Sequence, residues 1–325
     1  MKWLITGGCG FIGRALIRRL LAEGGHQIRV FDNLSVGSRE DLASEAEFAE
    51  LSDEIDELNT WSEDLALVVG DILDASLTES AISGADAVIH LAANTGVGPS
   101  VEDPHSDCHT NVIGTLNVLE GCRNAKVGRM VFASSGAPIG VQEPPLHEEM
   151  AAHPASPYGA SKLAGEGYCS AYYHCFDVET VVLRFGNVYG EGSTKKASVV
   201  AKFIKQALAG ETLEIYGDGT QTRDFIYLGD LVQAVYLAAT VKGVGGECFQ
   251  IATSAETNLA GLTEKLLDAI REVAGIEATW INGEQRQGDV ERNFSDTSKA
   301  KARLNWVAET TLEDGLRKTV KFFVH

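Results

Sequence analysis

Short apolar runs alternate with amphipathic segments through the first half of the chain. The amphipathic segments include residues 11–21, where Ile12, Leu16 and Leu20 recur at helical spacing, and residues 112–122. The apolar runs stand at residues 2–5, 27–31, 65–69, 87–91, 129–133 and 180–184. Runs this short and this apolar are typical of strands that are buried on both faces of a parallel sheet. Their alternation with helices therefore predicts an α/β fold with a doubly wound parallel sheet.

The pattern loosens after Asn187. A loop at residues 190–194, a helix at 199–208, a turn at 215–219 and a late strand at 248–252 are predicted there. We therefore expect a first domain over residues 1–185 and a smaller lobe over residues 186–325. The lobe would be interleaved with late strands of the first domain, at about residues 246–252.

A glycine-rich turn joins the first predicted strand to the first predicted helix. Gly7 permits a tight turn, Gly10 lets the backbone approach a phosphate, and Gly13 lets the helix pack close to the strand. The N–H groups of the helix N-terminus would then receive a dinucleotide pyrophosphate. An ordinary glycine-rich turn is the alternative. Asp32 favours the dinucleotide, because a carboxylate about twenty residues beyond the turn accepts hydrogen bonds from the ribose hydroxyls. It would repel a 2′-phosphate, so the first domain is interpreted as a Rossmann domain for NAD rather than NADP.

Tyr158 and Lys162 lie four residues apart in a segment predicted to be helical, so their side chains share one face. Free tyrosine has a pKa of about 10, but a neighbouring ammonium and a positive nicotinamide ring both favour the phenolate. Tyr158 could then take a proton from a substrate hydroxyl while a hydride passes from the same carbon to the nicotinamide. Ser135 or Ser134, just after an apolar strand, would hydrogen-bond the substrate oxygen. The alternative is an exposed pair of helix residues, which the dinucleotide turn makes a poor competitor.

Composition restricts the partners of the chain. Its 325 residues are 44% hydrophobic and 22% charged, enough to bury a substantial core. The formal charge of −19 disfavours binding to nucleic acid or to an anionic membrane surface. Much of this charge lies in residues 40–64, which we interpret as a solvated helix with Leu42, Ala46, Ala49 and Leu58 on its inner edge.

The six cysteines show no CxxC pair and no regular framework, which indicates a reducing compartment such as the cytoplasm. Cys169 and Cys175 could form a metal or redox pair with His174, but their place in an amphipathic helix favours core packing. We therefore expect no metal site. No apolar run reaches the length that spans a membrane, so we expect no membrane partner.

Nine segments of the chain match, in the same order, the motifs of a known family. They are TGGCGFIG, DNLSVGSRE, GDILD, HLAAN, NVIGTLNVLE, SPYGASKLAGE, LRFGNVYG, IYGDGTQTRDFIYLGDL and RQGDVERNFSDTSKAKARLNW, between residues 6 and 306. The chain resembles the extended short-chain dehydrogenase/reductases of the NAD-dependent nucleotide-sugar epimerase/dehydratase family, most of all the UDP-glucose (UDP-galactose) 4-epimerases. The resemblance implies a homodimer that binds NAD and a nucleotide sugar, UDP-linked by analogy.

The resemblance also implies further site residues. Cofactor contacts beyond the glycines, Asp32, Tyr158 and Lys162 are implied at Phe11, Ile12, Asn33, Asp71, Ile72, Leu91, Ala92, Ala93, Asn111, Ala133 and Phe185. Substrate contacts are implied at Asn94, Thr95, Asn187, Val200, Ile215, Tyr216, Arg223, Arg286 and Asn293. Among them, Asp71 and Ile72 would hold the adenine, and Asn187, Tyr216, Arg223 and Arg286 would grip the nucleotide diphosphate.

The segment after Ser135 distinguishes among the reactions of the family. Gly136 stands where most members carry serine or threonine, so the oxygen-binding role is assigned to Ser135, with Ser134 as the alternative. Dehydratases carry an acid pair and decarboxylases a glutamate at this place, whereas Gly136, Ala137 and Pro138 supply no carboxylate. We therefore expect epimerisation at C4 through a transient 4-keto sugar. A related dehydratase, decarboxylase or reductase, and a non-catalytic NAD-binding regulatory protein, stay open as alternatives, as does the identity of the sugar.

Overall fold

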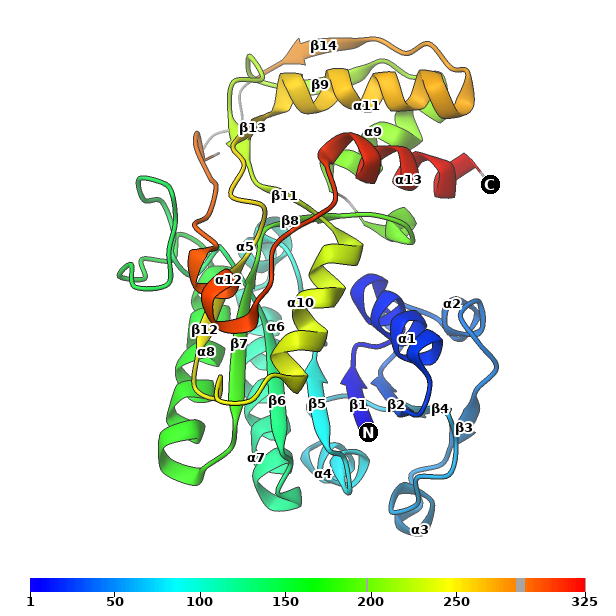
Figure 1. Ribbon diagram of the computed structural model, residues 1–325, viewed down its shortest axis with the longest axis vertical. Coiled ribbons are helices and arrows are strands. Elements are labelled where there is room, and N and C mark those ends of the chain that lie inside the picture. The colour runs from blue at the N-terminus through cyan, green and yellow to red at the C-terminus, as the bar shows by residue number, and fades with distance from the viewer. Residues whose placement is uncertain (197, 285–289, 325) are drawn as a thin grey trace. The chain divides into compact units, whose positions relative to one another are not determined.

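The computed structural model describes residues 1–196, 198–284 and 290–324, and Figure 1 shows its ribbon. The chain divides into two compact units that alternate along the sequence. The first unit holds residues 1–141, 150–184 and 232–249, and the second holds residues 142–149, 185–231 and those from 250 onward. The domain boundary predicted between residues 185 and 186 stays a prediction.

One sheet of eight strands forms the centre of the first unit (Figure 1). The strands are β1 (Lys2–Thr6), β2 (Gln27–Asp32), β3 (Ala49–Leu51), β4 (Leu65–Val69), β5 (Ala87–His90), β6 (Arg129–Ser135), β7 (Thr180–Phe185) and β12 (Cys248–Ile251). Their order is β12-β7-β6-β5-β1-β2-β4-β3, and β1 pairs in parallel with both β2 and β5. The doubly wound parallel sheet predicted from the apolar runs is therefore confirmed. The strand order reverses at β1, and ligands of such sheets bind at the carboxyl ends of the strands beside that point.

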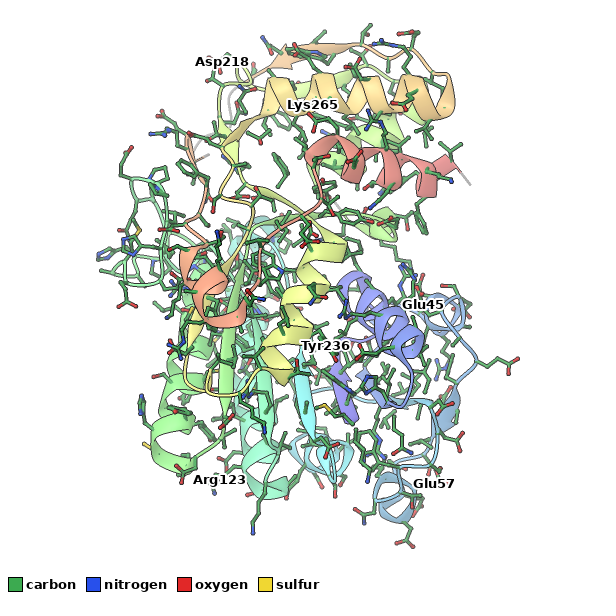
Figure 2. All side chains as sticks on the ribbon, viewed as in Figure 1. Glu45, Glu57, Arg123, Asp218, Tyr236 and Lys265 are labelled. Atoms are coloured by element: carbon green, nitrogen blue, oxygen red, sulfur yellow. The ribbon has the colours of Figure 1, made fainter. Side chains whose placement is uncertain are left out.

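Helices cover this sheet because each apolar stripe needs a partner surface. They are α1 (Phe11–Glu23), α2 (Arg39–Ala43), α3 (Ile55–Leu58), α4 (Ala75–Ile82), α5 (Val97–Glu102), α6 (Pro104–Cys108), a π-helical turn at His109–Gly114, α7 (Thr115–Ala125), α8 (Pro157–Phe176) and most of α10 (Leu228–Thr240). Ser156 caps α8 by accepting a hydrogen bond from the N–H of Gly159. In α10, Tyr236 stacks on buried Trp3 and donates a hydrogen bond to Glu23 at 2.6 Å (Figure 2).

The acidic segment at residues 40–64 is not the single helix that we predicted. Helix α2 ends at Ala43, Ala49–Leu51 form β3 at the sheet edge, and α3 covers only four residues. Pairing with β4 satisfies the backbone of β3, and a continuous helix could not offer that pairing. Glu45 is also drawn towards α1, where its carboxylate accepts two hydrogen bonds from Arg18 (Figure 2). Leu42 and Leu58 are buried, as the prediction required of an inner edge.

The two cysteines assigned to core packing have different surroundings. Cys169 is fully buried, whereas Cys175 is exposed, so the second half of that prediction is wrong. Six residues of an α-helix correspond to a rotation of about 240°, which places Cys175 away from the face that carries Cys169. None of the six cysteines, all of which lie in the described part of the chain, forms a disulfide. Among the described residues, no cluster of His, Cys, Asp and Glu is suited to a metal ion.

The second unit has its own strands, helices and core. Its elements are β8 (Asn187–Tyr189), a 3₁₀ turn (Ser193–Lys195), α9 (Val199–Leu208), β9 (Leu213–Tyr216), β10 (Thr222–Arg223), β11 (Phe225–Tyr227), β13 (Thr257–Asn258), α11 (Leu259–Ala274), β14 (Trp280–Gly283), α12 (Ser298–Leu304) and α13 (Leu312–Val324). Strands pair as β8 with β11, β9 with β14 and β10 with β13. The helix predicted at 199–208 is confirmed, whereas the turn predicted at 215–219 begins only after β9. In the part of the chain described, no helix is long and apolar enough to cross a membrane.

Candidate active site

The glycine turn lies between β1 and α1. Gly7 has a φ of +68°, and its N–H donates to the carbonyl oxygen of Phe31 at 2.9 Å. A Cβ at Gly7 would lie 2.8 Å from the backbone nitrogen of Ala92, so a larger residue would displace the backbone. Helix α1 begins at Phe11, and its N-cap residue Gly10 places no side chain over the helix end. The first turn of α1 therefore offers backbone N–H groups and the positive end of its dipole to an anion.

Asp32 ends β2 and closes the same site. Its two carboxylate oxygens accept hydrogen bonds from the N–H groups of Leu34 at 2.8 Å and Cys9 at 2.9 Å. Burial raises the pKa of Asp32, and these two backbone hydrogen bonds act in the opposite direction. The carboxylate is thus fixed beside the glycine turn, where acceptor oxygens suit ribose hydroxyls.

Asn33 and Asp71 lie together, although 38 positions separate them in the sequence. The side-chain nitrogen of Asn33 donates to Asp71 at 2.8 Å, which joins the residues after β2 to those after β4. Ile72 is buried, and its carbonyl accepts a hydrogen bond from Asn117. These three predicted cofactor residues, two of them assigned to the adenine, therefore occupy one region at the carboxyl end of the sheet.

The other predicted cofactor residues of this sheet also stand at the carboxyl ends of strands. Leu91, Ala92 and Ala93 directly follow β5, Ala133 lies near the end of β6, and Phe185 ends β7. The N–H of Ala92 donates to the hydroxyl oxygen of Thr6 at 3.2 Å, which ties the segment after β5 to the end of β1.

Tyr158 and Ser135 form the centre of the candidate site. Ser135 is the last residue of β6, Tyr158 lies in the first turn of α8, and their side chains are hydrogen-bonded. Burial raises the pKa of Tyr158, and the hydrogen bond with Ser135 lowers it. A phenol and a hydroxyl that share a hydrogen bond can both approach one oxygen atom of a ligand.

Lys162 lies one helical turn after Tyr158 and is 3% exposed. Its ammonium donates to the carbonyl oxygen of Ala133 at 3.0 Å and lies 4.9 Å from the ring centre of Phe132. Burial lowers the pKa of Lys162 to about 8, while the nearby carboxylate of Asp107 acts to raise it.

Ser134 has a different environment from Ser135. Its hydroxyl donates to the carboxylate of Glu166 at 2.5 Å, in a cluster that is almost fully buried. The same carboxylate accepts two hydrogen bonds from Arg184, at 2.9 and 2.7 Å. The hydroxyl of Ser134 therefore serves a buried ion pair, and Ser135 is the serine that contacts Tyr158.

Asn111 sits in the π-helical turn and joins several candidate residues. Its side-chain oxygen accepts from the N–H of Asn94, and its side-chain nitrogen lies within hydrogen-bond distance of Asp107 and Ser161. The side-chain nitrogen of Asn94 donates to the carbonyl and hydroxyl oxygens of Ser106, so the Asn94 side chain is hydrogen-bonded to α6. Thr95 is exposed.

Three buried polar residues of this site were not singled out from the sequence. They are Asp107, Ser161 and Glu166. Asp107 lies four residues before Asn111, Ser161 lies three residues after Tyr158, and Glu166 lies four residues after Lys162. This one-turn spacing from a predicted site residue is the signal that could have identified them.

The predicted substrate residues of the second unit fall into two groups. The side chains of Val200 and Ile215 belong to its hydrophobic core, where each is 1% exposed. Asn187 begins β8, Tyr216 ends β9 with Lys202 5.0 Å from its ring centre, and Arg223 donates to the carbonyl of Val290 at 2.7 Å. The N–H of Asn293 contacts Thr222, next to Arg223. Arg286 lies outside the described residues.

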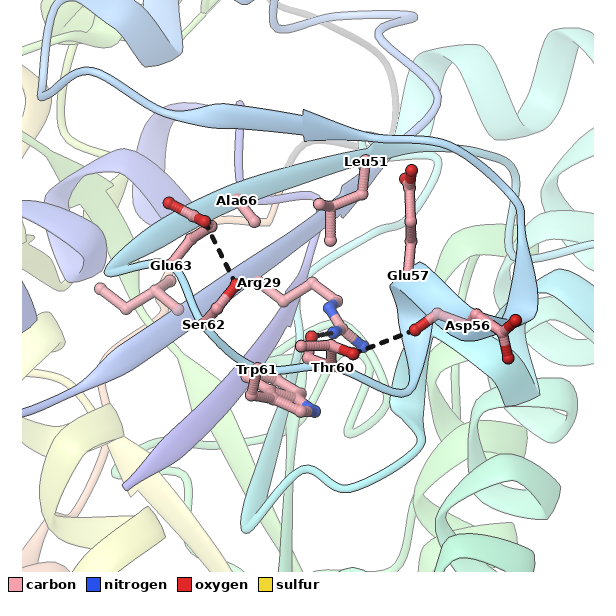
Figure 3. Close-up of a pocket in the computed structure, with 10 residues that line it drawn as sticks. Arg29, Leu51, Asp56, Glu57, Thr60, Trp61, Ser62, Glu63 and Ala66 are labelled. Carbon is pink, nitrogen blue, oxygen red and sulfur yellow. Dashed lines mark hydrogen bonds between the residues drawn. The ribbon is translucent and has the colours of Figure 1, made fainter.

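A separate pocket of about 310 Å³ lies elsewhere in the first unit (Figure 3). It is lined by Ile28, Arg29, Leu51, Asp56, Glu57, Thr60, Trp61, Ser62, Glu63 and Ala66, and none of these is a predicted site residue. Arg29 is buried at its centre, donates to the carbonyls of Ala81 and Thr60, and lies 4.1 Å from the ring centre of Trp61. Ile28 and Ala66 belong to the amino-terminal halves of β2 and β4, so the pocket lies away from the carboxyl ends that carry the candidate site.

Comparisons with known proteins agree with this geometry. The model of the NAD dependent epimerase/dehydratase family matches residues 3–252. The chain belongs to this family. It is 38% identical to the UDP-glucose 4-epimerase of Mycolicibacterium smegmatis, over 99% of this chain and 98% of the relative. The crystal structure of a Thermotoga maritima UDP-glucose 4-epimerase with UDP-glucose is similar at a TM-score of 0.86 and 33% identity, over 99% of this chain and 98% of the other.

Relatives within the family catalyse more than one reaction. The chain is 32% identical to the UDP-glucuronate 4-epimerase of Thermodesulfobacterium geofontis, over 98% of this chain and 95% of the relative. It is 30% identical to the dTDP-glucose 4,6-dehydratase of Haemophilus influenzae, over 100% of this chain and 98% of the relative. Membership of the family therefore shows that the chain belongs to a group of enzymes that act with NAD. It does not determine which reaction the protein catalyses or which sugar it binds.

NAD is the cofactor of the family, and the residues of the first unit fit it. A Thermus thermophilus UDP-glucose 4-epimerase solved with NAD has a TM-score of 0.83 and 33% identity, with 99% of both chains covered. Close packing of α1 on the glycine turn needs Gly13, because a Cβ there would lie 2.5 Å from the Cα of Gly8. The turn thus leaves room for a pyrophosphate over the uncapped helix end, with the carboxylate of Asp32 beside it.

Proposed function

We propose that the protein epimerises a UDP-linked sugar at C4 through a transient 4-keto intermediate. The observation that carries this proposal is the space beside the hydrogen-bonded pair of Ser135 and Tyr158. Gly136 follows Ser135, and a Cβ built on it would meet no atom within 4 Å. Neither Gly136 nor Ala137 can act as an acid or a base on C5 or C6 of the sugar. Oxidation at C4 and return of the hydride to the opposite face is the simplest reaction left to this site.

The side chains would have distinct roles in this reaction. NAD, when bound, supplies the acceptor and then the donor of the hydride. Tyr158 takes the proton of the C4 hydroxyl and returns it after the sugar has rotated. The Ser135 hydroxyl holds the C4 oxygen in line with Tyr158, with which it already shares a hydrogen bond. Lys162 contributes a positive charge in a buried setting, where it stabilises negative charge on the phenol oxygen more strongly than it would in water.

The second unit would bind the nucleotide. Asn187, Tyr216 and Arg223 offer an amide, an aromatic ring and a guanidinium, which suit a diphosphate and a base. The assignment of UDP is supported by similar structures, one of which is a UDP-glucose 4-epimerase that contains UDP-glucose.

Substrate deuterated at C4 provides the test of the reaction. We expect the epimeric product to retain its deuterium at C4, because the hydride removed from that carbon returns to it without leaving the site. The measurement is NMR of the products from UDP-glucose, UDP-N-acetylglucosamine and UDP-glucuronate, each incubated separately with the protein. Loss of the label to solvent, release of carbon dioxide or a stable 6-deoxy-4-keto sugar would contradict the epimerase proposal. Such a result would favour the dehydratase, decarboxylase or reductase alternatives. Absence of turnover with bound NAD would favour a regulatory protein.

Cofactor preference depends on Asp32. The unmodified protein should bind NAD more tightly than NADP, because the Asp32 carboxylate lies beside the glycine turn and would repel a 2′-phosphate. Asp32→Ala should lower the ratio of the NADP Kd to the NAD Kd by about tenfold or more. The reason is that the variant loses one charge-assisted contact with the ribose of NAD. Calorimetric titration of both dinucleotides into both proteins gives the four values. Tighter binding of NADP to the unmodified protein would show that Asp32 is not the ribose contact.

The homodimer and the cytoplasmic location stay predictions. Helix α8 carries the exposed rings of Tyr168 and Phe176, at 40% and 45%, and Ile113 is 43% exposed in the π-helical turn at His109–Gly114. Side chains of this kind are commonly covered by a second subunit. Sedimentation velocity should therefore give the mass of a dimer, and a monomer at micromolar concentration would contradict the prediction.

A further inference from the structure

Asp224 is a buried carboxylate of the second unit that the proposed mechanism does not use. It follows directly after β10, is 1% exposed, and accepts four hydrogen bonds from described residues. One carboxylate oxygen accepts from the N–H and the hydroxyl of Thr253, at 2.7 and 2.6 Å. The other accepts from the N–H groups of Ser254 at 3.0 Å and Ser295 at 3.3 Å. These donors replace the water that burial takes away from the carboxylate.

The hydrogen bonds of Asp224 join segments that are far apart in the sequence. Thr253 lies shortly after β12, Asp224 stands between β10 and β11, and Ser295 belongs to the stretch at residues 290–296, the 290–296 segment. The N–H of Asn187, at the start of β8, also donates to the backbone carbonyl oxygen of Asp224 at 2.8 Å. One residue thus contacts three other segments of the second unit.

The 290–296 segment runs alongside β10. The N–H of Thr222 donates to the carbonyl oxygen of Glu291 at 2.8 Å, and the side chain of Arg223 donates to the carbonyl oxygen of the residue before it at 2.7 Å. The N–H of Asn293 donates to the hydroxyl oxygen of Thr222 at 3.4 Å. Two predicted substrate residues, Arg223 and Asn293, therefore lie on neighbouring stretches that these hydrogen bonds connect.

Leu146 holds the opposite edge of the same segment. Its N–H donates to the carbonyl oxygen of Phe294, and its carbonyl oxygen accepts from the N–H of Asp296, each at 2.8 Å. The N–H groups of alternate residues, Asn293 and Ser295, are directed to the β10 side instead. The hydrogen bond from Ser295 therefore fixes the later part of the segment on that side.

We propose that Asp224 is a positioning residue for the nucleotide sugar, whose carboxylate holds the 290–296 segment against β10 and so sets the spacing of Arg223 and Asn293. This inference rests on the proposed function, which assigns the nucleotide to the second unit. Asp224 does not touch the ligand in this account. Groups that bind one ligand together must be held at the correct spacing, because a displacement of about 1 Å can cost about 10²-fold in activity.

Hydrogen exchange of the protein without substrate tests the anchor itself. Asp224→Ala removes the acceptor of the Ser295 N–H, which is otherwise buried in a hydrogen bond. We expect the Ser295 amide hydrogen to exchange about tenfold faster or more in this variant, because local opening of the segment becomes easier. Exchange measured by mass spectrometry on peptides that cover residues 290–296 gives this rate.

Two substitutions at Ser295 isolate the contact from the other duties of the carboxylate. Ser295→Pro removes the N–H that donates to Asp224 and leaves the carboxylate its three other hydrogen bonds. Ser295→Ala keeps this N–H and loses only the hydroxyl, which donates to Gln250 at 3.3 Å. Calorimetric titration of UDP into the NAD-loaded protein should give a Kd about tenfold higher for Ser295→Pro and for Asp224→Ala. Ser295→Ala should keep the wild-type Kd.

Asp230→Ala is the matched control for Asp224→Ala. Asp230 is a carboxylate of the same unit and also accepts hydrogen bonds from the N–H and the hydroxyl of one threonine, Thr310, at 3.0 and 3.2 Å. The stretch around Thr310 carries no predicted substrate residue. Asp230→Ala should therefore lower the temperature of thermal unfolding and leave the Kd of UDP unchanged. The Kd of NAD, which we assign to the first unit, should be the same in every variant.

The outcomes separate this inference from the proposed function. Unchanged exchange in Asp224→Ala, or equal UDP affinity of Ser295→Pro and Ser295→Ala, would overturn the inference even if the enzyme epimerises sugars. Equal weakening by Asp224→Ala and Asp230→Ala would also overturn it, because a general loss of stability would then be the cause. Ser295→Pro keeps the carboxylate, so the Ser295 pair decides the question even if Asp224→Ala does not fold.

The wild type gives the remaining two results. A protein that binds UDP through this arrangement and turns over none of the three sugars would refute epimerisation and leave the inference standing. A wild type that binds no UDP would overturn both the inference and the assignment of the nucleotide to the second unit.

Discussion

A Tyr158→Phe variant should fold and bind NAD like the wild type, and its kcat should fall by about 10³-fold or more. Phenylalanine keeps the aromatic ring of Tyr158, and the interaction that the variant loses is the hydrogen bond with Ser135. Loss of the hydroxyl removes both the proton acceptor and one of the two groups that hold the C4 oxygen. KM should change much less than kcat, because the second unit is proposed to bind the nucleotide. Steady-state kinetics and NAD titration give both quantities.

Tyr168→Phe is the control for this variant. Tyr168 lies on the same helix, is 40% exposed and undergoes the same chemical change. Its kcat should equal that of the wild type. Near-normal turnover by Tyr158→Phe would show that Tyr158 is not the base, and another residue would then have to accept the proton.

Most of the sheet could be predicted because its strands are buried on both faces. The apolar runs at residues 2–5 and 65–69 correspond closely to β1 and β4. Their apolar side chains, such as those of Leu4 and Leu67, are fully buried in the core. The acidic segment at 40–64 could not be predicted in the same way. Its short strand β3 lies at the sheet edge and depends on pairing with β4, which no local pattern records.

The candidate site was predicted where function demands a particular residue type at a particular spacing. The Gly7 turn, Asp32 and the pair of Tyr158 and Lys162 all meet this condition, and the structure places each at the carboxyl end of the sheet or on α8. Residue type alone does not distinguish Ser134 from Ser135, and the assignment to Ser135 came from the resemblance to the family. In the structure the distinction depends on the alternation of side chains along β6, which directs one hydroxyl to Glu166 and the other to Tyr158.

The π-helical turn was missed for a related reason. The periodicity of residues 112–122 indicated a regular helix, yet residues 109–114 form a π turn before α7. An extra residue in a turn leaves the apolar stripe on either side almost intact, so it gives no sequence signal. Its consequence is local, because it places Asn111 where its amide contacts both Asp107 and Ser161.

Loss of the Glu166 charge should be the most damaging change to stability among the residues around the site. Glu166→Gln leaves the guanidinium of Arg184 buried without its carboxylate, and removing one partner of a buried pair costs about 3–5 kcal/mol of unfolding free energy. The double variant Glu166→Gln with Arg184→Met removes both charges and should recover much of this loss. Chemical denaturation of the full-length protein, followed by tryptophan fluorescence, measures the unfolding free energy of each variant.

Glu50→Gln provides a control with the same bonding geometry and a different environment. Arg39 holds Glu50 through two hydrogen bonds at 2.8 and 2.7 Å, as Arg184 holds Glu166, but both side chains of this pair are nearly half exposed. Water replaces the lost contact there, so stability should not change measurably. Equal losses in the two single variants would show that burial does not govern the Glu166 pair. Ser134 also donates a hydrogen bond to Glu166. If the Glu166→Gln, Arg184→Met double variant regains stability and keeps its turnover, the buried cluster around Ser134 is structural. The catalytic hydroxyl is then that of Ser135.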